Sequence, residues 1–227
     1  MYTYGYFIGC LILGIVWLLI LIIRKDLRKE ILFGSILGLP FGFMEFFIVP
    51  EYWNPPSIFN LIHKLGFGIE SFIFAFFVAG IAAVAYEFIT KSKLKRIKSD
   101  HKTHIFPYIA VMLWFVALEI LIPSKTVFNL CIALFAGAGI IAIKRPDLIK
   151  QIITSGFIFG VLYTLLFSFF MKLFPGFIQQ TYSLQNFLGV FILDVPIEET
   201  LFAFSVGACW STFFEYIKGY KLSLKKL

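Results

Sequence analysis

Three carboxylates lie within a long apolar run near the end of the chain. The segment DVPIEETLF, residues 194–202, places Asp194, Glu198 and Glu199 around Pro196, within the run NFLGVFILDVPIEETLFAFSVGACWSTFF. A charged carboxylate at the centre of a membrane helix costs at least ~2.5 kcal/mol, so such groups must be paired, protonated or functional. A carboxyl kept neutral by apolar surroundings can also deliver a proton to a substrate.

Pro196 determines the local geometry of these carboxylates. It lacks a backbone N–H and clashes with the carbonyl four residues earlier, at Ile192, so a helix should kink or begin afresh here. A helix that begins afresh places its positive end beside Glu198 and Glu199. Adjacent helical side chains point about 100° apart. One of the two glutamates should therefore line a cavity, while the other meets a neighbouring helix.

Three interpretations of the carboxylates remain open on the residues alone. They could fix helix register by hydrogen bonding to Ser, Tyr or Asn on other helices. They could couple ions or protons in a small membrane transporter. They could also perform acid catalysis on a lipid-phase substrate. Ionisable residues inside membranes are functional by default, which favours the last two interpretations.

The elements that must position these residues are membrane helices. Hydrophobic residues make up 60% of the 227, and 30 residues are phenylalanine; the mean hydropathy is +0.91. A helix needs roughly 20 apolar residues to cross the hydrocarbon. The sequence predicts an all-α, polytopic membrane helical bundle of about seven transmembrane helices, at 6–23, 31–50, 65–89, 105–122, 126–143, 152–174 and 187–215.

The basic residues predict the orientation of these spans. Most Lys and Arg fall in four segments, at 24–29, 91–102, 144–150 and 218–227. Seven spans put all four on one side, which the positive-inside rule makes the cytoplasm. We therefore expect a cell-membrane protein with its N-terminus outside and its C-terminus inside. The net charge of +7 is explained by orientation and anionic lipid, so no nucleic acid is expected.

The chain also repeats itself. GIESFIFAFFVAGIAAVAYEFI (68–89) resembles PIEETLFAFSVGACWSTFFEYI (196–217), with Glu70, Phe74, Phe76 and Glu87 each identical to the residue 128 positions later, and KDLRKEI (25–31) resembles PDLIKQI (146–152). This predicts tandem three-helix repeats, 1–90 and 126–227, joined by a basic loop and linking helix at 91–125. The linking helix makes the repeats parallel, about an axis along the membrane normal. Glu70 and Glu198 should then approach a central cavity.

The other ionisable residues suggest less. Glu45 and Glu119 are single carboxylates in two other predicted spans, and no spacing connects them to the motif. Glu87 and Glu215 end the motif helices beside basic segments, so interfacial ion pairs are expected. No His or Cys has metal-ligand spacing within a span, and we predict no metal site. The sequence contains no GxGxxG, P-loop, GxSxG or HExxH, so no soluble cofactor is expected either.

These motifs resemble a known family. VPIEETLFAF resembles the P-(L/I)-E-E-x-L-F-F signature of the non-flavin, integral-membrane lycopene cyclases, and YWNPP before GIESFIFAF resembles their W/Y-N-P segment. The tandem repeat with a linking helix is similar to their fused form. Two departures stand out. The first copy has Gly68 and Ser71 where the family has Pro and a second Glu, and the second copy lacks the tryptophan and Asn-Pro of its loop.

The resemblance implies an isomerase (intramolecular lyase) that cyclises the end group of a linear carotenoid, converting lycopene to a β- or ε-type ring without a cofactor. Glu198 is the predicted proton donor, with Glu199 or Glu70 as its partner or final base. The predicted substrate-binding residues are Pro196, Phe202, Phe204, Phe74, Phe76, Trp53 and Asn54. The expected partners are the lipid-phase carotenoid and the membrane, and a homo-oligomer is compatible with the sequence.

The alternatives are a small membrane transporter and a related enzyme that modifies carotenoid or isoprenoid end groups. A cyclase should have a lateral, lipid-open cavity lined by phenylalanine. A transporter should instead have a water path from the YWNPP side to the basic loop.

Overall fold

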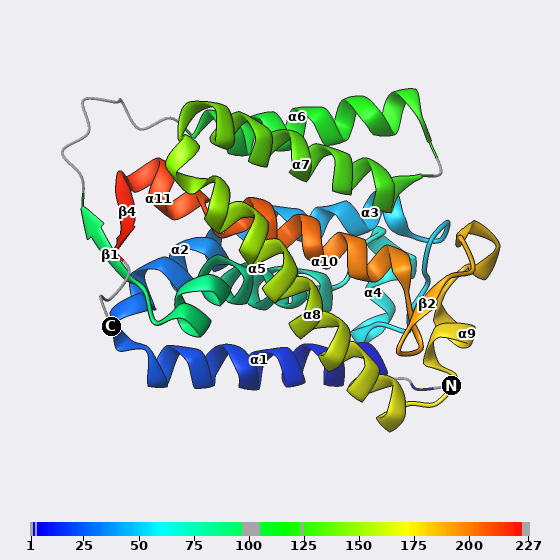
Figure 1. The fold of residues 1–227 in the computed structure, drawn as a ribbon. Coiled ribbons are helices and arrows are strands. Elements are labelled where there is room, and N and C mark those ends of the chain that lie inside the picture. The colour runs from blue at the N-terminus through cyan, green and yellow to red at the C-terminus, as the bar shows by residue number, and fades with distance from the viewer. Residues whose placement is uncertain (1, 3, 97–104, 124, 224–227) are drawn as a thin grey trace.

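The computed structural model describes residues 2, 4–96, 105–123 and 125–223, which form a bundle of helices (Figure 1). The elements are, in chain order, α1 (Gly5–Ile23), the 3-10 helix η1 (Lys25–Leu27), α2 (Arg28–Gly38), η2 (Leu39–Met44), α3 (Glu45–Ile48), η3 (Ile58–Asn60), α4 (Leu61–Leu65), α5 (Ile69–Thr90), β1 (Lys93–Arg96), α6 (Phe106–Leu121), α7 (Thr126–Lys144), η4 (Pro146–Leu148), α8 (Ile149–Leu173), α9 (Phe177–Thr181), η5 (Leu184–Asn186), β2 (Phe191–Ile192), β3 (Val195–Pro196), α10 (Ile197–Trp210), α11 (Phe213–Lys218) and β4 (Tyr220–Ser223).

The prediction of an all-α membrane bundle is confirmed. Among the described residues, five helical segments are long and apolar enough to cross a membrane, and a sixth apolar helix, α6, is shorter. The predicted span 187–215 instead divides into the hairpin β2–β3, α10 and α11. A turn with left-handed backbone at Leu193 and Asp194 joins the two strands. The helix thus begins afresh directly after Pro196, as its missing N–H predicted.

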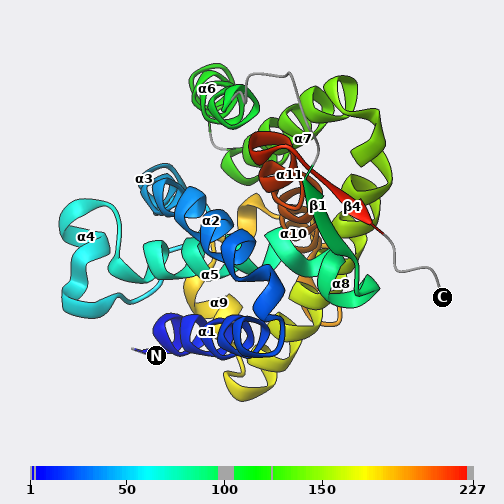
Figure 2. The ribbon, with the colours of Figure 1, turned by 90° about the vertical axis from the view of Figure 1, so that its left-hand side faces the viewer.

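The two motif helices, α5 and α10, occupy the interior of the bundle. α1 and α2 pack on α5, and α7 and α8 pack on α10 in the same order. Figure 2, a view along the bundle, shows α5 and α10 with the other helices around them. The linking helix α6 packs against α7. The division of the chain at residues 90 and 125 stays a prediction.

The bundle has two chemically different ends. The loop end carries the N-terminus, residues 50–64 and residues 175–187, and it lies at the right of Figure 1. The basic end carries residues 24–29, 144–150, β1 and β4, which form an antiparallel pair with Arg96 opposite Tyr220. Part of the predicted basic loop, residues 97–104, lies outside the described residues, together with His101 and His104.

Close helix contacts in the interior depend on small residues. A Cβ added at Gly34 on α2 would lie 2.6 Å from the Cβ of Ala83 on α5. A Cβ added at Gly207 on α10 would lie 2.6 Å from the carbonyl oxygen of Ser155 on α8. Small residues let helix backbones approach closely in membranes, where packing drives association.

We predict that Gly207→Ala lowers the thermal unfolding midpoint of the purified protein in detergent. The added methyl would overlap the backbone of α8, and overpacking typically costs about 1–3 kcal/mol. The matched control is Gly139→Ala, where no atom lies within 4 Å of the added Cβ. Its midpoint should stay the same or rise, because alanine favours helix by about 1 kcal/mol over glycine. Equal midpoints for the two variants would contradict the packing described here.

Candidate active site

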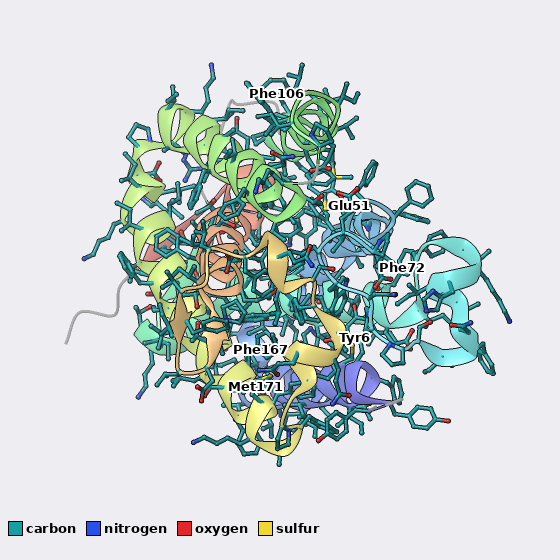
Figure 3. All side chains as sticks on the ribbon, turned by 90° about the vertical axis from the view of Figure 1, so that its right-hand side faces the viewer. Tyr6, Glu51, Phe72, Phe106, Phe167 and Met171 are labelled. Atoms are coloured by element: carbon teal, nitrogen blue, oxygen red, sulfur yellow. The ribbon has the colours of Figure 1, made fainter. Side chains whose placement is uncertain are left out.

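A cavity of about 200 Å³ lies between the helices toward the loop end. Its walls come from α1, η2, α3, α5, α7, α8 and α10 and from the two outer loops, and most of the lining side chains are apolar. Figure 3, a view from the loop end, shows two of the lining residues, Tyr6 and Phe167. The hydroxyl and carboxyl groups of the lining belong to Tyr6, Glu45, Tyr52, Ser71, Tyr163, Tyr182 and Glu199.

Glu199 is the carboxyl that the second motif presents to the cavity. It is 7% exposed. Its Oε1 accepts a hydrogen bond of 3.1 Å from the Tyr52 hydroxyl, and its Oε2 accepts one of 3.1 Å from the Tyr163 hydroxyl. Burial raises the pKa of the Tyr52 phenol well above its usual value. The Tyr52 hydroxyl therefore remains protonated and acts as a donor to Glu199.

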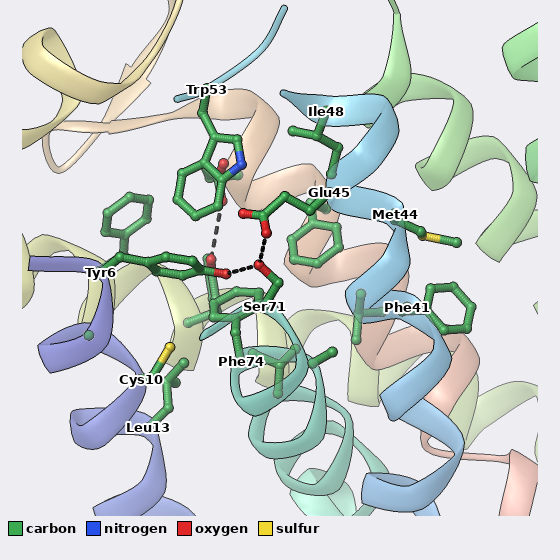
Figure 4. A pocket seen from close by; sticks show the side chains of 18 of the residues that line it. Tyr6, Cys10, Leu13, Phe41, Met44, Glu45, Ile48, Trp53, Ser71 and Phe74 are labelled. Atoms are coloured by element: carbon green, nitrogen blue, oxygen red, sulfur yellow. Dashed lines mark hydrogen bonds between the residues drawn. The ribbon is translucent and has the colours of Figure 1, made fainter. Parts of the chain in front are cut away.

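Glu45 is the second carboxyl of the cavity, and it lies at the start of α3. Its Oε2 accepts hydrogen bonds from the Gly68 N–H, at 2.7 Å, and from the Ser71 hydroxyl. Tyr6 donates in turn to the Ser71 oxygen at 3.1 Å, and Figure 4 shows this chain of three side chains beside Trp53. The Oε1 of Glu45 has no hydrogen-bond partner among the described residues.

Glu70 and Glu198 lie outside the cavity lining. Glu70 Oε1 accepts a 2.6 Å hydrogen bond from the Ile58 backbone N–H. Glu198 Oε1 accepts a 2.6 Å hydrogen bond from the Leu188 backbone N–H. Both carboxylates thus hold the segment that precedes their own helix. The predicted divergence of Glu198 and Glu199 is present, but Glu198 meets a loop and not a neighbouring helix.

The predicted aromatic residues divide in the same way. Phe74 and Phe202 line the cavity, with ring centroids 6.4 Å and 6.2 Å from that of Tyr163. Phe76 packs on Trp17 of α1, and Phe204 packs on Phe157 of α8. With 3.6 residues per turn, positions 71, 74 and 78 share one helix face, as do 199, 202 and 206. The residues two positions further on, Phe76 and Phe204, point elsewhere.

The two outer loops pair with each other over the cavity. Trp53 and Tyr182 form an antiparallel bridge, and Trp53 also lines the cavity, 4.6 Å from the Tyr6 ring. The Asn54 N–H donates to the Thr181 carbonyl at 2.6 Å, so Asn54 joins the loops and does not line the cavity. Pro196 is likewise buried outside the lining, directly before α10.

Sequence reasoning missed several residues of this site. Glu45 had only the general signal of an ionisable group inside a membrane. Ser71 was visible as a departure from the motif, but its bond to Glu45 was not. The partners of Glu199 come from a loop and from α8, at positions 52 and 163, and no local pattern links these tyrosines to the motif.

The structure corrects the expectation that Glu87 and Glu215 form interfacial ion pairs. The ion pairs between described residues are Arg24–Asp26 and Arg145–Asp147. Glu87 and Glu215 are both 0% exposed and accept hydrogen bonds from Gln151. Both side chains lie inside the bundle, because the faces of α5 and α11 that carry them point inward and not toward the basic segments.

The fold and the cavity define a helical membrane protein with a buried carboxyl and tyrosine site. Residues 125–217, which run from α7 into α11, match the family model described as lycopene cyclase. No curated protein and no solved structure matches the chain. This match agrees with the motif resemblance, and the matched part of the chain contains Glu199, Tyr163, Tyr182 and Phe202.

We predict that Glu198→Leu loosens the loop before α10, because it removes the acceptor of the Leu188 N–H. Losing a hydrogen bond of this kind costs about 0.5–1.5 kcal/mol, so amide exchange in a peptide containing Leu188 should accelerate by roughly two- to tenfold. Glu198→Gln is the matched control, since its amide oxygen can still accept the bond. Hydrogen–deuterium exchange read by mass spectrometry measures both variants; identical protection in Glu198→Leu and wild type would show that the bond does not hold the loop.

Proposed function

We propose that the protein is a lycopene-cyclase-type isomerase that closes a ring at the end of a linear carotenoid. The observation that carries the proposal is the pair of buried carboxyls, Glu199 and Glu45, in one mostly apolar cavity. A proton adds to the terminal alkene, the resulting tertiary cation closes on a nearby double bond, and another proton leaves. The overall reaction involves no net redox change, so an acid, a base and a cavity without water suffice.

Glu199 serves as the proton donor in this proposal. Its apolar surroundings favour the neutral carboxyl before reaction. After the proton leaves, the hydroxyl groups of Tyr52 and Tyr163 already point at its two oxygens. Hydrogen bonds to a charged acceptor are stronger than those to a neutral one, so these donors stabilise the carboxylate that forms.

Glu45 serves as the base. One of its oxygens is held by Gly68 and Ser71, while the other has no partner among the described residues and is available to accept a proton. Ser71 stands at the position equivalent to Glu199. The chain thus has a carboxyl near both motif helices, although its first motif lacks the second glutamate.

The aromatic lining suits a cationic intermediate. Phe74, Phe202 and Trp53 bring ring faces and edges to the cavity, and ring faces attract a nearby positive charge. The volume of about 200 Å³ is below the ~300–1,000 Å³ typical of small-molecule pockets. We therefore expect one end of the polyene to enter at a time, with the remainder in the lipid. The apolar walls favour such a substrate over an ion path.

Glu198 and Glu70 act as positioning residues here, holding the two loops that cover the cavity. The basic end faces the cytoplasm by the positive-inside rule, so the cavity lies toward the outer leaflet. This places the entry of the carotenoid within the hydrocarbon of the membrane and not in either aqueous phase.

Pigment analysis of a lycopene-accumulating bacterial host tests the proposal. The wild-type chain should convert lycopene to a cyclic carotene. Glu199→Gln should reduce conversion by about 10²-fold or more, the usual contribution of general acid catalysis. Glu45→Gln should do the same. Glu198→Gln, which keeps the loop contact, should retain most of the conversion at equal protein level.

Two results would contradict this assignment. Loss of conversion in Glu198→Gln but not in Glu199→Gln would return the donor role to Glu198. Unchanged lycopene in a host with well-expressed, folded wild-type protein would reject lycopene cyclisation and favour another isoprenoid end group or transport.

A further inference from the structure

Three glutamates meet inside the bundle near its basic end, away from the cavity. Glu30 comes from α2, Glu87 from α5 and Glu215 from α11, and each is 0% exposed. One carboxylate oxygen from each lies within 4.8 Å of the others. Ser71, in the cavity wall, and Glu87 are separated along α5 by 16 residues, or about 24 Å at 1.5 Å per residue. The cluster is therefore a separate site.

The described cations do not balance these carboxylates. Arg24 is bonded to Asp26 and to the backbone carbonyls of Glu87 and Ser92. Arg145 is bonded to Asp147 and to the carbonyl of Tyr220. Burying charge without a partner is very costly. The cluster requires either added protons or a cation.

Unpartnered oxygens in the cluster point to a ligand. Within the described chain, both oxygens of Glu30 and one each of Glu87 and Glu215 accept no hydrogen bond. The amide of Gln151, which is 2% exposed, lies against the cluster with its nitrogen 2.9 Å from Glu87 Oε1 and 2.7 Å from Glu215 Oε1. Its Oε1 also has no described partner. The same nitrogen donates to the Ser211 carbonyl at 2.6 Å, which holds the amide with its nitrogen toward the carboxylates. The unpartnered oxygens of Glu30, Glu87 and Glu215 are therefore the groups that a ligand would meet.

The four side chains are two pairs of equivalent residues. Glu87 and Glu215 are 128 positions apart and match in the repeated motif. Glu30 and Gln151 occupy the same place in KDLRKEI and PDLIKQI. Equivalent positions from the two halves of the chain therefore converge on one point, supplied by α2 and α5 on one side and by α8 and α11 on the other.

We propose that Glu30, Glu87 and Glu215 bind one divalent cation that prefers oxygen ligands, such as Mg²⁺ or Mn²⁺, while Gln151 orients two of these carboxylates by hydrogen bonds. Such ions take carboxylate and carbonyl oxygens at about 2.0–2.6 Å, and modest side-chain rotation would bring the unpartnered oxygens to that distance. Two positive charges against three carboxylates leave one negative charge, and the guanidinium group of Arg24 lies nearby, bonded to the backbone carbonyl of Glu87. The ion joins the two halves of the bundle at the basic end and takes no part in proton transfer.

Manganese binding to the purified full-length protein tests this inference. After treatment with EDTA and its removal, the protein is titrated with MnCl₂, and bound Mn²⁺ is counted by electron paramagnetic resonance. We expect one Mn²⁺ per chain and a higher thermal unfolding midpoint in MnCl₂ than in EDTA. Glu87→Gln and Glu30→Gln should each weaken binding by at least about tenfold, as changes around metal ligands do.

Two controls separate this site from other carboxylates. Glu119→Gln removes a carboxylate that is bonded to Thr126 and Asn129 on the other side of the bundle, and it should bind Mn²⁺ as the wild type does. Glu199→Gln should also bind Mn²⁺ normally while losing cyclisation, so the metal site and the proposed reaction fail independently. Wild-type protein that holds no Mn²⁺ and unfolds at the same temperature in MnCl₂ and EDTA would overturn the inference. That result would indicate that protons shared among the carboxyls stabilise the cluster instead. This measurement needs no variant to fold.

Discussion

The structure depends on one requirement, that every carboxyl buried among apolar helices must find a donor, a proton or a cation. Backbone N–H groups meet this need for Glu70 and Glu198, which bond to Ile58 and Leu188. Hydroxyl groups meet it for Glu199. Because each contact joins a motif helix to a loop or to another helix, satisfying the carboxyls also fixes where the loops and helices lie. The polar groups thus determine the shape of a bundle whose apolar faces alone would pack in many ways.

The two halves of the chain solve this problem with similar parts and different details. Phe74 and Phe202 face the cavity and Phe76 and Phe204 face away, because equivalent helices have equivalent faces. The polar positions have diverged. Ser71 occupies the position in the first motif that Glu199 occupies in the second, and Ser71 donates a hydrogen bond to Glu45 of α3. A cavity with two different carboxyl environments can assign the acid role to one and the base role to the other, which two identical sites would not do.

The sequence was most informative where the determinant is local. Apolar length predicted the membrane helices, and Pro196 predicted the start of a helix because a missing N–H acts within one turn. It was least informative where the determinant is the rotation of one helix against another. Tyr52 and Tyr163 are 147 and 36 residues from Glu199, and Glu87 and Glu215 face inward although basic residues flank them. The motif identified the helix that carries the site, but the tertiary contacts decide which of its two glutamates enters the cavity.

The central helices connect the two polar regions of the molecule. α5 carries Ser71 near the loop end and Glu87 near the basic end, and the α10–α11 segment carries Glu199 and Glu215 in the same order. A rigid helix that is fixed at one end has little freedom to rotate at the other, since its interior contacts are close and made by small residues. Contacts of Glu87 with Gln151 therefore limit the rotation of α5, which carries Ser71 at its other end, and Ser71 in turn holds Glu45 at the cavity.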